Sequence, residues 1–228
     1  MTKVGGLPLV LIGAGGHAKV VLSLARALGR EVLGVCDPAL AREGATSWRG
    51  LPVLGDDAAL SGFGPDRIVL LNGIGQVPHG TVRQSLHEHW ASQGFRFVTL
   101  IHPCAVVDPT ATLGDGVQVM AGAIVQADVT IGADVIVNTG ARVDHDCRIG
   151  DHVHIAPGAV LCGGVTTGAG AFLGAGCVVL QQVDIGVGAI VSAGALLARP
   201  LATGTLHAPH RRSPPPRPAD PSTPGDLA

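Results

Sequence analysis

Aliphatic residues recur at every sixth position from residue 101 to residue 197. The series keeps one register, and only Thr167 departs from aliphatic character: Ile101, Val107, Leu113, Val119, Val125, Ile131, Val137, Val143, Ile149, Ile155, Leu161, Thr167, Leu173, Val179, Ile185, Val191 and Leu197. The residue four places later is small or Val over the stretch from Ala123 to Val165. A period of six fits neither a helix nor an ordinary sheet. It is typical of a parallel β-helix, in which three hexads form one triangular coil and the aliphatic series points inward.

Glycine spacing supports the same coil. The chain has 34 glycines in 228 residues, well above ordinary usage. One series repeats every 18 residues: Gly114, Gly132, Gly150, Gly168 and Gly186. We expect these glycines to stack at one corner of the prism, where Gly accepts a positive φ without Cβ strain. Aromatic residues make up only 3% of the chain, so small aliphatic side chains are expected to form the core.

Residues 8–100 show a different pattern, in which apolar runs alternate with helical spacing. The predicted strands are 8–13, 31–36, 67–71 and 95–100, and the predicted helices are 18–28, closed by Gly29, and 82–93. This alternation predicts a small Rossmann-like α/β domain with a parallel sheet. We expect three parts: the α/β domain over 1–100, the β-helix over 101–206, and a disordered Pro-rich tail over 207–228.

A glycine-rich turn follows the first predicted strand. Residues 13–18, Gly-Ala-Gly-Gly-His-Ala, fit the looser G-x-G-x-x-G/A pattern that holds a phosphate at a helix N-terminus. Asp37 ends the next strand, where a dinucleotide fold places its ribose-binding acid. A domain of about 90 residues is too short for both halves of that fold, so a nucleotide sugar fits better than NAD. A plain tight turn is the alternative, and Asp37 favours ligand binding.

His145 is the candidate catalytic side chain of the repeat. A histidine inside an aliphatic prism is costly, so the hexad register predicts a corner or outer position for it. Asp144 and Asp146 flank the ring, and an imidazole titrates where general base catalysis needs it. Gly163 follows 18 residues later, so its N–H is expected one coil away, where it can hold an oxyanion. The residues alone leave solvated surface histidines as the alternative, and slightly favour it.

Other site chemistries and partners fit the sequence less well. The spacings of His145, His152 and His154 do not match the His-x4-His zinc sites of β-helical carbonic anhydrases, and a site from His154 and Cys162 is unsupported. No metal is therefore predicted. The five cysteines form no CxxC motif and are expected to be small buried hydrophobes in a reducing compartment. The net charge of −2 and the lack of a basic cluster argue against nucleic-acid binding. We expect no signal peptide and no membrane span, hence a cytoplasmic protein.

Several segments resemble the NeuD/PglD-type sugar O- and N-acetyltransferases, over residues 8 to about 206. The resemblance rests on segments 13–21, 35–38, 72–75 and 97–103, and above all on 138–147, Asn-Thr-Gly-Ala-Arg-Val-Asp-His-Asp-Cys. It implies a left-handed β-helix and a homotrimer with acetyl-CoA bound between adjacent β-helices. Acetyl-CoA would be a co-substrate, with no permanently bound cofactor.

The resemblance also implies roles for individual residues. His145 takes the place of the family's base, and Asp146 hydrogen-bonds its imidazole. Further active-site positions match Asn138, His154 and Gly163, with His154 beside the acetyl group. The acetyl-CoA contacts fall on His154, Ala175 and Ala193. The nucleotide sugar would bind through Gly15, Gly16, His17, Asp37, Pro38 and Gly73.

The implied reaction is direct transfer of an acetyl group to the amino group of a nucleotide-linked amino sugar, for polysaccharide biosynthesis. O-acetylation of sialic acid or another sugar hydroxyl stays open, as does a non-catalytic scaffold or ligand-binding subunit. An NAD-linked enzyme ranks last, because the repeat offers no hydride-acceptor site. One departure concerns the end of the repeat. Many members have Gly-Val-Pro-Ala-Lys there, whose cation can meet the CoA phosphate, whereas this chain has His-Ala-Pro-His-Arg at 207–211.

Overall fold

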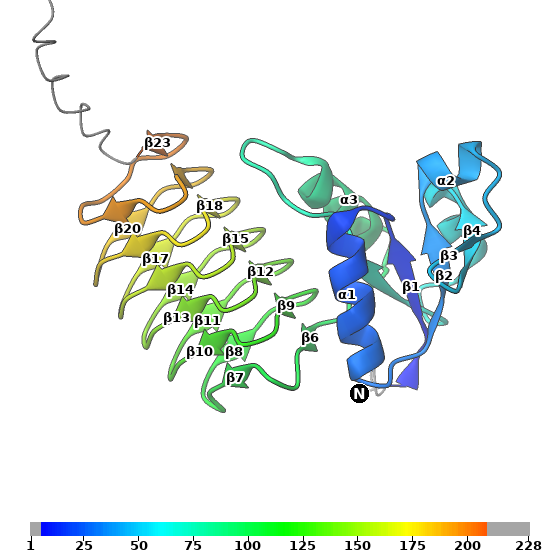
Figure 1. Cartoon of the computed structure of the whole chain (residues 1–228), viewed down its shortest axis with the longest axis horizontal. Coiled ribbons are helices and arrows are strands. Elements are labelled where there is room, and N and C mark those ends of the chain that lie inside the picture. The colour runs from blue at the N-terminus through cyan, green and yellow to red at the C-terminus, as the bar shows by residue number, and fades with distance from the viewer. Residues whose placement is uncertain (1–5, 209–228) are drawn as a thin grey trace, which may run out of the picture.

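The computed structural model describes residues 6–208 and consists of two units side by side (Figure 1). An α/β unit forms the N-terminal part, and a three-faced parallel β-helix follows it. The last strand includes His207, so the repeat continues past the boundary predicted at residue 206. The rest of the predicted tail, from residue 209 on, lies outside the described residues.

The N-terminal sheet has five strands in the order β3-β4-β2-β1-β5. Their bounds are β1 Leu9–Ile12, β2 Val32–Cys36, β3 Ser47–Trp48, β4 Leu51–Gly55 and β5 Val69–Asn72. Four of them pair in parallel, as predicted, and β3, an additional short edge strand, runs antiparallel to β4. Arg49 and Gly50 both have positive φ, 47° and 79°, as a two-residue hairpin turn requires.

Helices flank this sheet: α1 Gly16–Ala27, α2 Pro38–Arg42, the 3₁₀ helix η2 Asp57–Gly62 and α3 Val82–Ser92. The apolar face of α1 is buried, and Gly29, with φ of 63°, follows its C-terminus as predicted. The predicted strand at 95–100 was largely wrong. Only an isolated bridge joins Phe97 to the sheet, because the chain crosses here to β6, Leu100–Ile101, which already pairs with the β-helix.

The left-handed β-helix has three faces of two-residue strands. The seven-stranded face contains β6, β9 Gln118–Val119, β12 Ile136–Val137, β15 His154–Ile155, β18 Phe172–Leu173, β21 Ile190–Val191 and β23 Leu206–His207. The six-stranded face contains β7 Val106–Val107, β10 Ile124–Val125, β13 Arg142–Val143, β16 Val160–Leu161, β19 Val178–Val179 and β22 Leu196–Leu197. The five-stranded face contains β8 Thr112–Leu113, β11 Thr130–Ile131, β14 Arg148–Ile149, β17 Thr166–Thr167 and β20 Asp184–Ile185.

The second residue of each strand points into the prism, which confirms the series predicted from the period of six. From Val119 to Leu197 these residues are buried and, with the small residues of the turns, form one apolar core. Thr167, the exception in the series, is buried too. Its hydroxyl accepts a hydrogen bond from the N–H of Gly150 at 3.2 Å, so its polar atom has a partner inside the prism.

The glycines spaced by 18 residues stack at one corner as predicted, but for a different reason. None of the five has a positive φ. A Cβ on Gly114 would come within 2.7 Å of the backbone of Gly132 in the next coil, and a Cβ on Gly150 would meet Ala169 at the same distance. Gly is therefore required by the close approach of stacked backbones. Positive φ occurs instead two residues later, for example at Gly116 and Asp134.

The outward residues give each face a different character. The five-stranded face is polar: Thr112, Thr130, Arg148, Thr166 and Asp184. The six-stranded face is mostly apolar: Val106, Ile124, Arg142, Val160, Val178 and Leu196. On the seven-stranded face, Ile136 packs into the core of the N-terminal unit, which covers the first coils of this face. The loop between β5 and α3 reaches from that unit toward the later coils (Figure 1).

The five cysteines are free, and the prediction that all are buried was wrong for two of them. Cys36, Cys147 and Cys177 are buried, whereas Cys162 is half-buried and Cys104 is exposed. Cys104 lies in the turn between β6 and β7, in the first coil of the β-helix, which has a neighbouring coil on one side only. No helix within residues 6–208 is long and apolar enough to cross a membrane.

Candidate active site

His145 lies at the corner between the six-stranded and five-stranded faces, in the turn that joins β13 to β14. Its Nδ1 is 2.7 Å from Oδ2 of Asp146, and its backbone N–H donates to Oδ1 of Asp144. Both side chains of the dyad are well exposed, at 62% and 67%. The hydrogen bond to Asp146, with the nearby charge of Asp144, raises the pKa of His145. In the neutral ring Nδ1–H donates to Asp146, so Nε2 is left as a free proton acceptor.

Gly163 lies directly beneath this ring, one coil away as the period predicts. A Cβ at residue 163 would come within 2.5 Å of Cε1 and 2.6 Å of Nε2 of His145. Its carbonyl accepts from Gln182 N–H, but its own N–H donates to no acceptor among residues 6–208. The missing side chain thus makes room for the imidazole.

His154 lies on the seven-stranded face and is buried. Thr139 N–H donates to Oδ1 of Asn138 at 2.8 Å, which orients that amide so that Nδ2 faces Nε2 of His154 at 3.2 Å. Nε2 therefore accepts, and the ring proton of His154 is on Nδ1. Burial, reinforced by the nearby His17, lowers the pKa of His154 to about 4. His154 is a neutral hydrogen-bond donor at Nδ1.

An apolar groove of about 620 Å³ runs along the corner between the seven-stranded and six-stranded faces. It is lined by His154 and by the turns that contain Ala175 and Ala193, with Pro78 and His79 of the β5–α3 loop above it. The N–H groups of Ala175 and Ala193 make no hydrogen bond within the described residues. Three positions expected to contact acetyl-CoA thus line one groove, with backbone donors free for a ligand's carbonyl groups.

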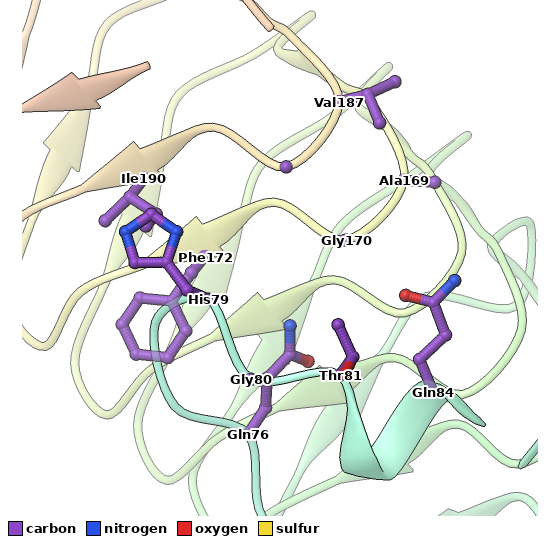
Figure 2. Close-up of a pocket in the computed structure, with 11 residues that line it drawn as sticks. Gln76, His79, Gly80, Thr81, Gln84, Ala169, Gly170, Phe172, Val187 and Ile190 are labelled. Carbon is purple, nitrogen blue, oxygen red and sulfur yellow. The ribbon is translucent and has the colours of Figure 1, made fainter. Parts of the chain in front are cut away.

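A second, smaller cavity of about 290 Å³ lies beside this groove, between the β5–α3 loop and the β-helix (Figure 2). Gln76, Thr81 and Gln84 line one side of it, and Ala169, Gly170 and Val187 of the β-helix line the other. His79, Phe172 and Ile190 border both cavities.

The glycine-rich turn opens α1 with free backbone donors. Gly15 is the N-cap and has no side-chain cap, and Cβ atoms at Gly15 and Gly16 would meet nothing within 4 Å. Such an open helix N-terminus suits a phosphate. Gly13 has a φ of 86°, which favours glycine. A Cβ on Gly73 would come within 2.6 Å of the carbonyl oxygen of Ile12, so this position also requires glycine.

Asp37 fastens this turn to α2. Its Oδ2 accepts from Ala14 N–H at 2.8 Å, and its Oδ1 caps α2 by accepting from Ala39 and Leu40 N–H. Pro38 is the first residue of α2. The expected contact of Asp37 with a nucleotide stays a prediction; in the structure its carboxylate orders the loop that the nucleotide would approach.

His17 joins the N-terminal unit to the β-helix. Its Nε2 is 2.7 Å from Oε1 of Gln118 in β9, and burial, reinforced by the nearby cation of Arg83, lowers the pKa of His17 to about 4. His17 thus lies between the N-terminus of α1 and the face that contains His154.

These residues fall into two groups. The first group lies on or beside the seven-stranded face and contains the turn before α1, His17, Asn138, His154, Ala175 and Ala193. His145, Asp146 and Gly163 lie at the opposite corner, in a cavity lined only by residues of that corner among those described. One chain therefore does not bring the dyad to the groove.

Comparison with known proteins matches both units. Residues 8–89 match the PglD N-terminal domain, and residues 110–145 and 128–163 match the bacterial transferase hexapeptide (six repeats). PerB from Caulobacter crescentus, solved with CoA and GDP-perosamine, is 42% identical, with coverage of 87% of this chain and 92% of that one and a TM-score of 0.79. The acetyltransferase domain of PglB from Neisseria gonorrhoeae, solved with acetyl coenzyme A, is 38% identical, with 90% and 98% coverage and a TM-score of 0.81. This chain belongs to the PglD-type hexapeptide-repeat acetyltransferase family.

A curated member of that family, the UDP-N-acetylbacillosamine N-acetyltransferase of Bacillus subtilis, is 39% identical over 116 residues. The match spans 51% of that relative's length and 50% of this chain. The PglD-type resemblance inferred from the sequence motifs is therefore confirmed.

A buried polar cluster in this PglD-type protein was missed by the sequence analysis. Arg83 of α3 forms a 2.6 Å ion pair with Asp134 of the β-helix, both fully buried, and also donates to Ile74 O at 2.6 Å. Asp134 contacts Nδ1 of His152 at 3.3 Å, so His152 is part of this junction and not a surface histidine. Through these contacts the cluster joins the N-terminal unit to the β-helix.

The same cluster contains the one group of described residues close enough to hold a metal. His87, Asp134 and His152 offer donor atoms within 4.8 Å of one another. Arg83 already neutralises Asp134, so a divalent cation would add uncompensated positive charge to a buried site. The donor set therefore does not fit a metal, and its role is structural.

Proposed function

We propose that this chain transfers an acetyl group from acetyl-CoA to the amino group of a nucleotide-linked amino sugar, with His145 as general base. The observation that carries the proposal is the His145–Asp146 dyad, whose free Nε2 stands over Gly163. In this proposal each of the two expected domains binds one substrate. Residues 1–100 bind the nucleotide sugar at the start of α1, and residues 101–206 hold acetyl-CoA in the apolar groove.

The groove suits the pantetheine arm of CoA. Its apolar lining matches the methylene chain, and the free N–H groups of Ala175 and Ala193 can donate to the arm's amide carbonyls. His154 borders the groove, and its Nδ1–H is buried without an acceptor among the described residues, so it is the donor left for the thioester carbonyl oxygen of a bound acetyl-CoA. A neutral donor already fixed in place stabilises the oxyanion as it forms.

The chemical step is direct. The amine nitrogen attacks the thioester carbon while His145 Nε2 removes a proton, and the C–S bond breaks to release CoA, which receives that proton. Asp146 holds the imidazole in the required tautomer and stabilises the imidazolium that forms. Positioning of two bound substrates accounts for much of the acceleration.

We propose further that the enzyme is a homotrimer that completes the site. The dyad and the groove lie at the two corners that border the six-stranded face. That face is an apolar stripe, with Val106 62% and Leu196 58% exposed, as expected of a surface that another subunit covers. Three copies packed through this face place the His145 corner of each beside the groove of the next. A cytoplasmic location, where acetyl-CoA is made, belongs to the same proposal.

The test of the function is release of CoA from acetyl-CoA with UDP-, dTDP- and GDP-linked 4-amino sugars and with free sialic acid. We expect turnover with one of the amino sugars, together with a product that carries the acetyl group on nitrogen. Turnover with sialic acid alone would replace the proposal with O-acetylation. Failure of the protein to bind acetyl-CoA would overturn it in favour of a non-catalytic scaffold.

A further inference from the structure

The side-chain amide of Gln118 is buried and has both ends paired. It is 1% exposed, and its Nε2 donates to the carbonyl oxygen of Asn72 at 2.7 Å. Its Oε1 faces Nε2 of His17 at 2.7 Å. Gln118 thus links the end of β5 to the ring that follows the glycine-rich turn, 101 residues away in the sequence.

These contacts fix the tautomer of His17. A carbonyl oxygen only accepts, so the amide nitrogen of Gln118 must face Asn72 and its oxygen must face the imidazole. Two facing acceptors would repel, so Nε2 of His17 carries a proton and donates it. Since His17 is neutral, as its pKa of about 4 indicates, its Nδ1 has no proton and presents a lone pair.

The orientation of Gln118 is itself secured by the junction between the two units. Arg83, paired with Asp134, donates to the same Asn72 carbonyl at 3.4 Å and to Ile74 O at 2.6 Å. The carbonyl that orients Gln118 is therefore held in place by buried partners on α3 and the β-helix.

His17 and His154 consequently have opposite hydrogen-bonding roles at Nδ1. Asn138 makes His154 a donor there, whereas Gln118 makes His17 an acceptor. Nδ1 of His17 makes no hydrogen bond within the described residues. The two neutral rings are close enough for a charge on His17 to lower the pKa of His154. His154 is therefore suited to donate to the thioester oxygen, and His17 is suited to accept from a hydrogen-bond donor.

We propose that Gln118 is a positioning residue that commits His17 to accept a hydrogen from the attacking group, and that the site thereby selects a primary amine over a hydroxyl. This inference rests on the proposed function, in which His145 of a neighbouring subunit is the base. An amine has two N–H hydrogens and one lone pair. One hydrogen goes to Nε2 of His145, the other to Nδ1 of His17, and the lone pair points at the thioester carbon.

A hydroxyl does not satisfy this arrangement. It has one O–H, so one of the two imidazole acceptors would face an oxygen lone pair without a partner, which is costly in a closed site. After transfer to an amine, the amide product keeps one N–H, and that hydrogen stays on Nδ1 of His17. His17 neither gains nor loses a proton, because the transferred one leaves through His145.

The tautomer is tested without any substrate. Nitrogen NMR of protein labelled with ¹⁵N-histidine, with His17→Asn to assign the signal, distinguishes a protonated Nε2 from a protonated Nδ1. We expect His17 to carry its proton on Nε2 at pH 7. In Gln118→Met the tautomer preference should be lost, and in the exposed control Gln93→Met it should be unchanged. A wild-type ring protonated on Nδ1 would overturn the inference, whatever the enzyme's activity.

The selectivity is tested with a nucleotide-linked 4-amino sugar and its 4-hydroxy analogue. Gln118→Met and His17→Leu should each lower kcat/KM for the amine by about tenfold or more, with little loss for the hydroxyl, so the amine-to-hydroxyl ratio falls. An unchanged ratio in variants that still acetylate the amine would overturn the inference and leave the proposed function standing. Absence of acetylation by the wild-type protein would instead count against the proposed function.

Discussion

Replacement of His145 by Ala is expected to lower kcat for acetyl transfer by about a hundredfold to ten-thousandfold, the range typical of a general base. The KM for acetyl-CoA should stay near the wild-type value, because His145 is the base for the amine and is not among the residues that line the groove for the pantetheine arm. The side chain is 62% exposed, so the melting temperature should hardly change. Release of CoA measured by thiol titration, with the amino sugar that the wild-type protein accepts, gives both constants.

The pH dependence of the reaction tests the same assignment. His145 acts as a base only when neutral, and its pKa is raised, chiefly by the hydrogen bond to Asp146. The rate should therefore fall as the pH drops through this raised pKa. In Asp146→Asn the acidic limb should move to lower pH and the plateau should be lower, because the imidazole becomes a weaker base. His145→Ala with wild-type kcat, or an acidic limb that Asp146→Asn does not move, would contradict the assignment.

Replacement of Gly163 by Ala is expected to lower kcat by about tenfold to a hundredfold with little loss of stability. The new Cβ would come within 2.5 Å of the imidazole of His145. That ring is 62% exposed, so it has room to turn away from the new methyl group, which preserves the fold but displaces the base. Displacement of a catalytic group by about 1 Å can cost about a hundredfold in rate. Because Ala retains its N–H, the loss would report the displaced ring and not a lost hydrogen-bond donor.

A matched control is available in the N-terminal unit. A Cβ on Gly62 meets nothing within 4 Å, and this glycine has an ordinary φ, so Gly62→Ala should keep wild-type kcat and melting temperature. If Gly163→Ala also keeps wild-type kcat, the position of His145 above Gly163 is not the catalytic one.

The β-helix was predictable because every coil imposes the same demand. A residue that points into the prism must be aliphatic, so the period of six identified the inward series and its exception Thr167. The period of 18 placed Gly163 beneath His145. The reason for the stacked glycines could not be read from the period, because it depends on how closely the backbones of neighbouring coils approach at Gly114 and Gly150.

The junction between the two units was not predictable in the same way. Arg83 and Asp134 are 51 residues apart and belong to elements with unrelated periodicities, so no repeat links them. His17 was expected to bind substrate, but its partner Gln118 lies in an outward position that looked like ordinary surface. The sequence offers only a Gln on an outward column; its burial follows from the N-terminal unit that covers this part of the face.

The short hairpin of β3 and β4 was also missed. Its signal was Arg49-Gly50 between short runs, which is weak because Arg seldom adopts positive φ. The segment at 95–100 has the reverse problem, because a strong strand pattern is present where hardly any strand forms. Its apolar residues satisfy a strand pattern, but they are buried at the crossing between two units and make a single bridge.

The most direct test of the account is complementation between two inactive variants. His145→Ala lacks the base, and Ala175→Trp, at an exposed turn, blocks the groove. When the two variants are co-expressed, they form mixed trimers in which His145 of one chain faces the open groove of the other. A site shared between subunits predicts about a quarter of wild-type activity for random assembly, because half of the bases and half of the grooves are intact. A mixture no more active than either variant alone would contradict a site shared between subunits.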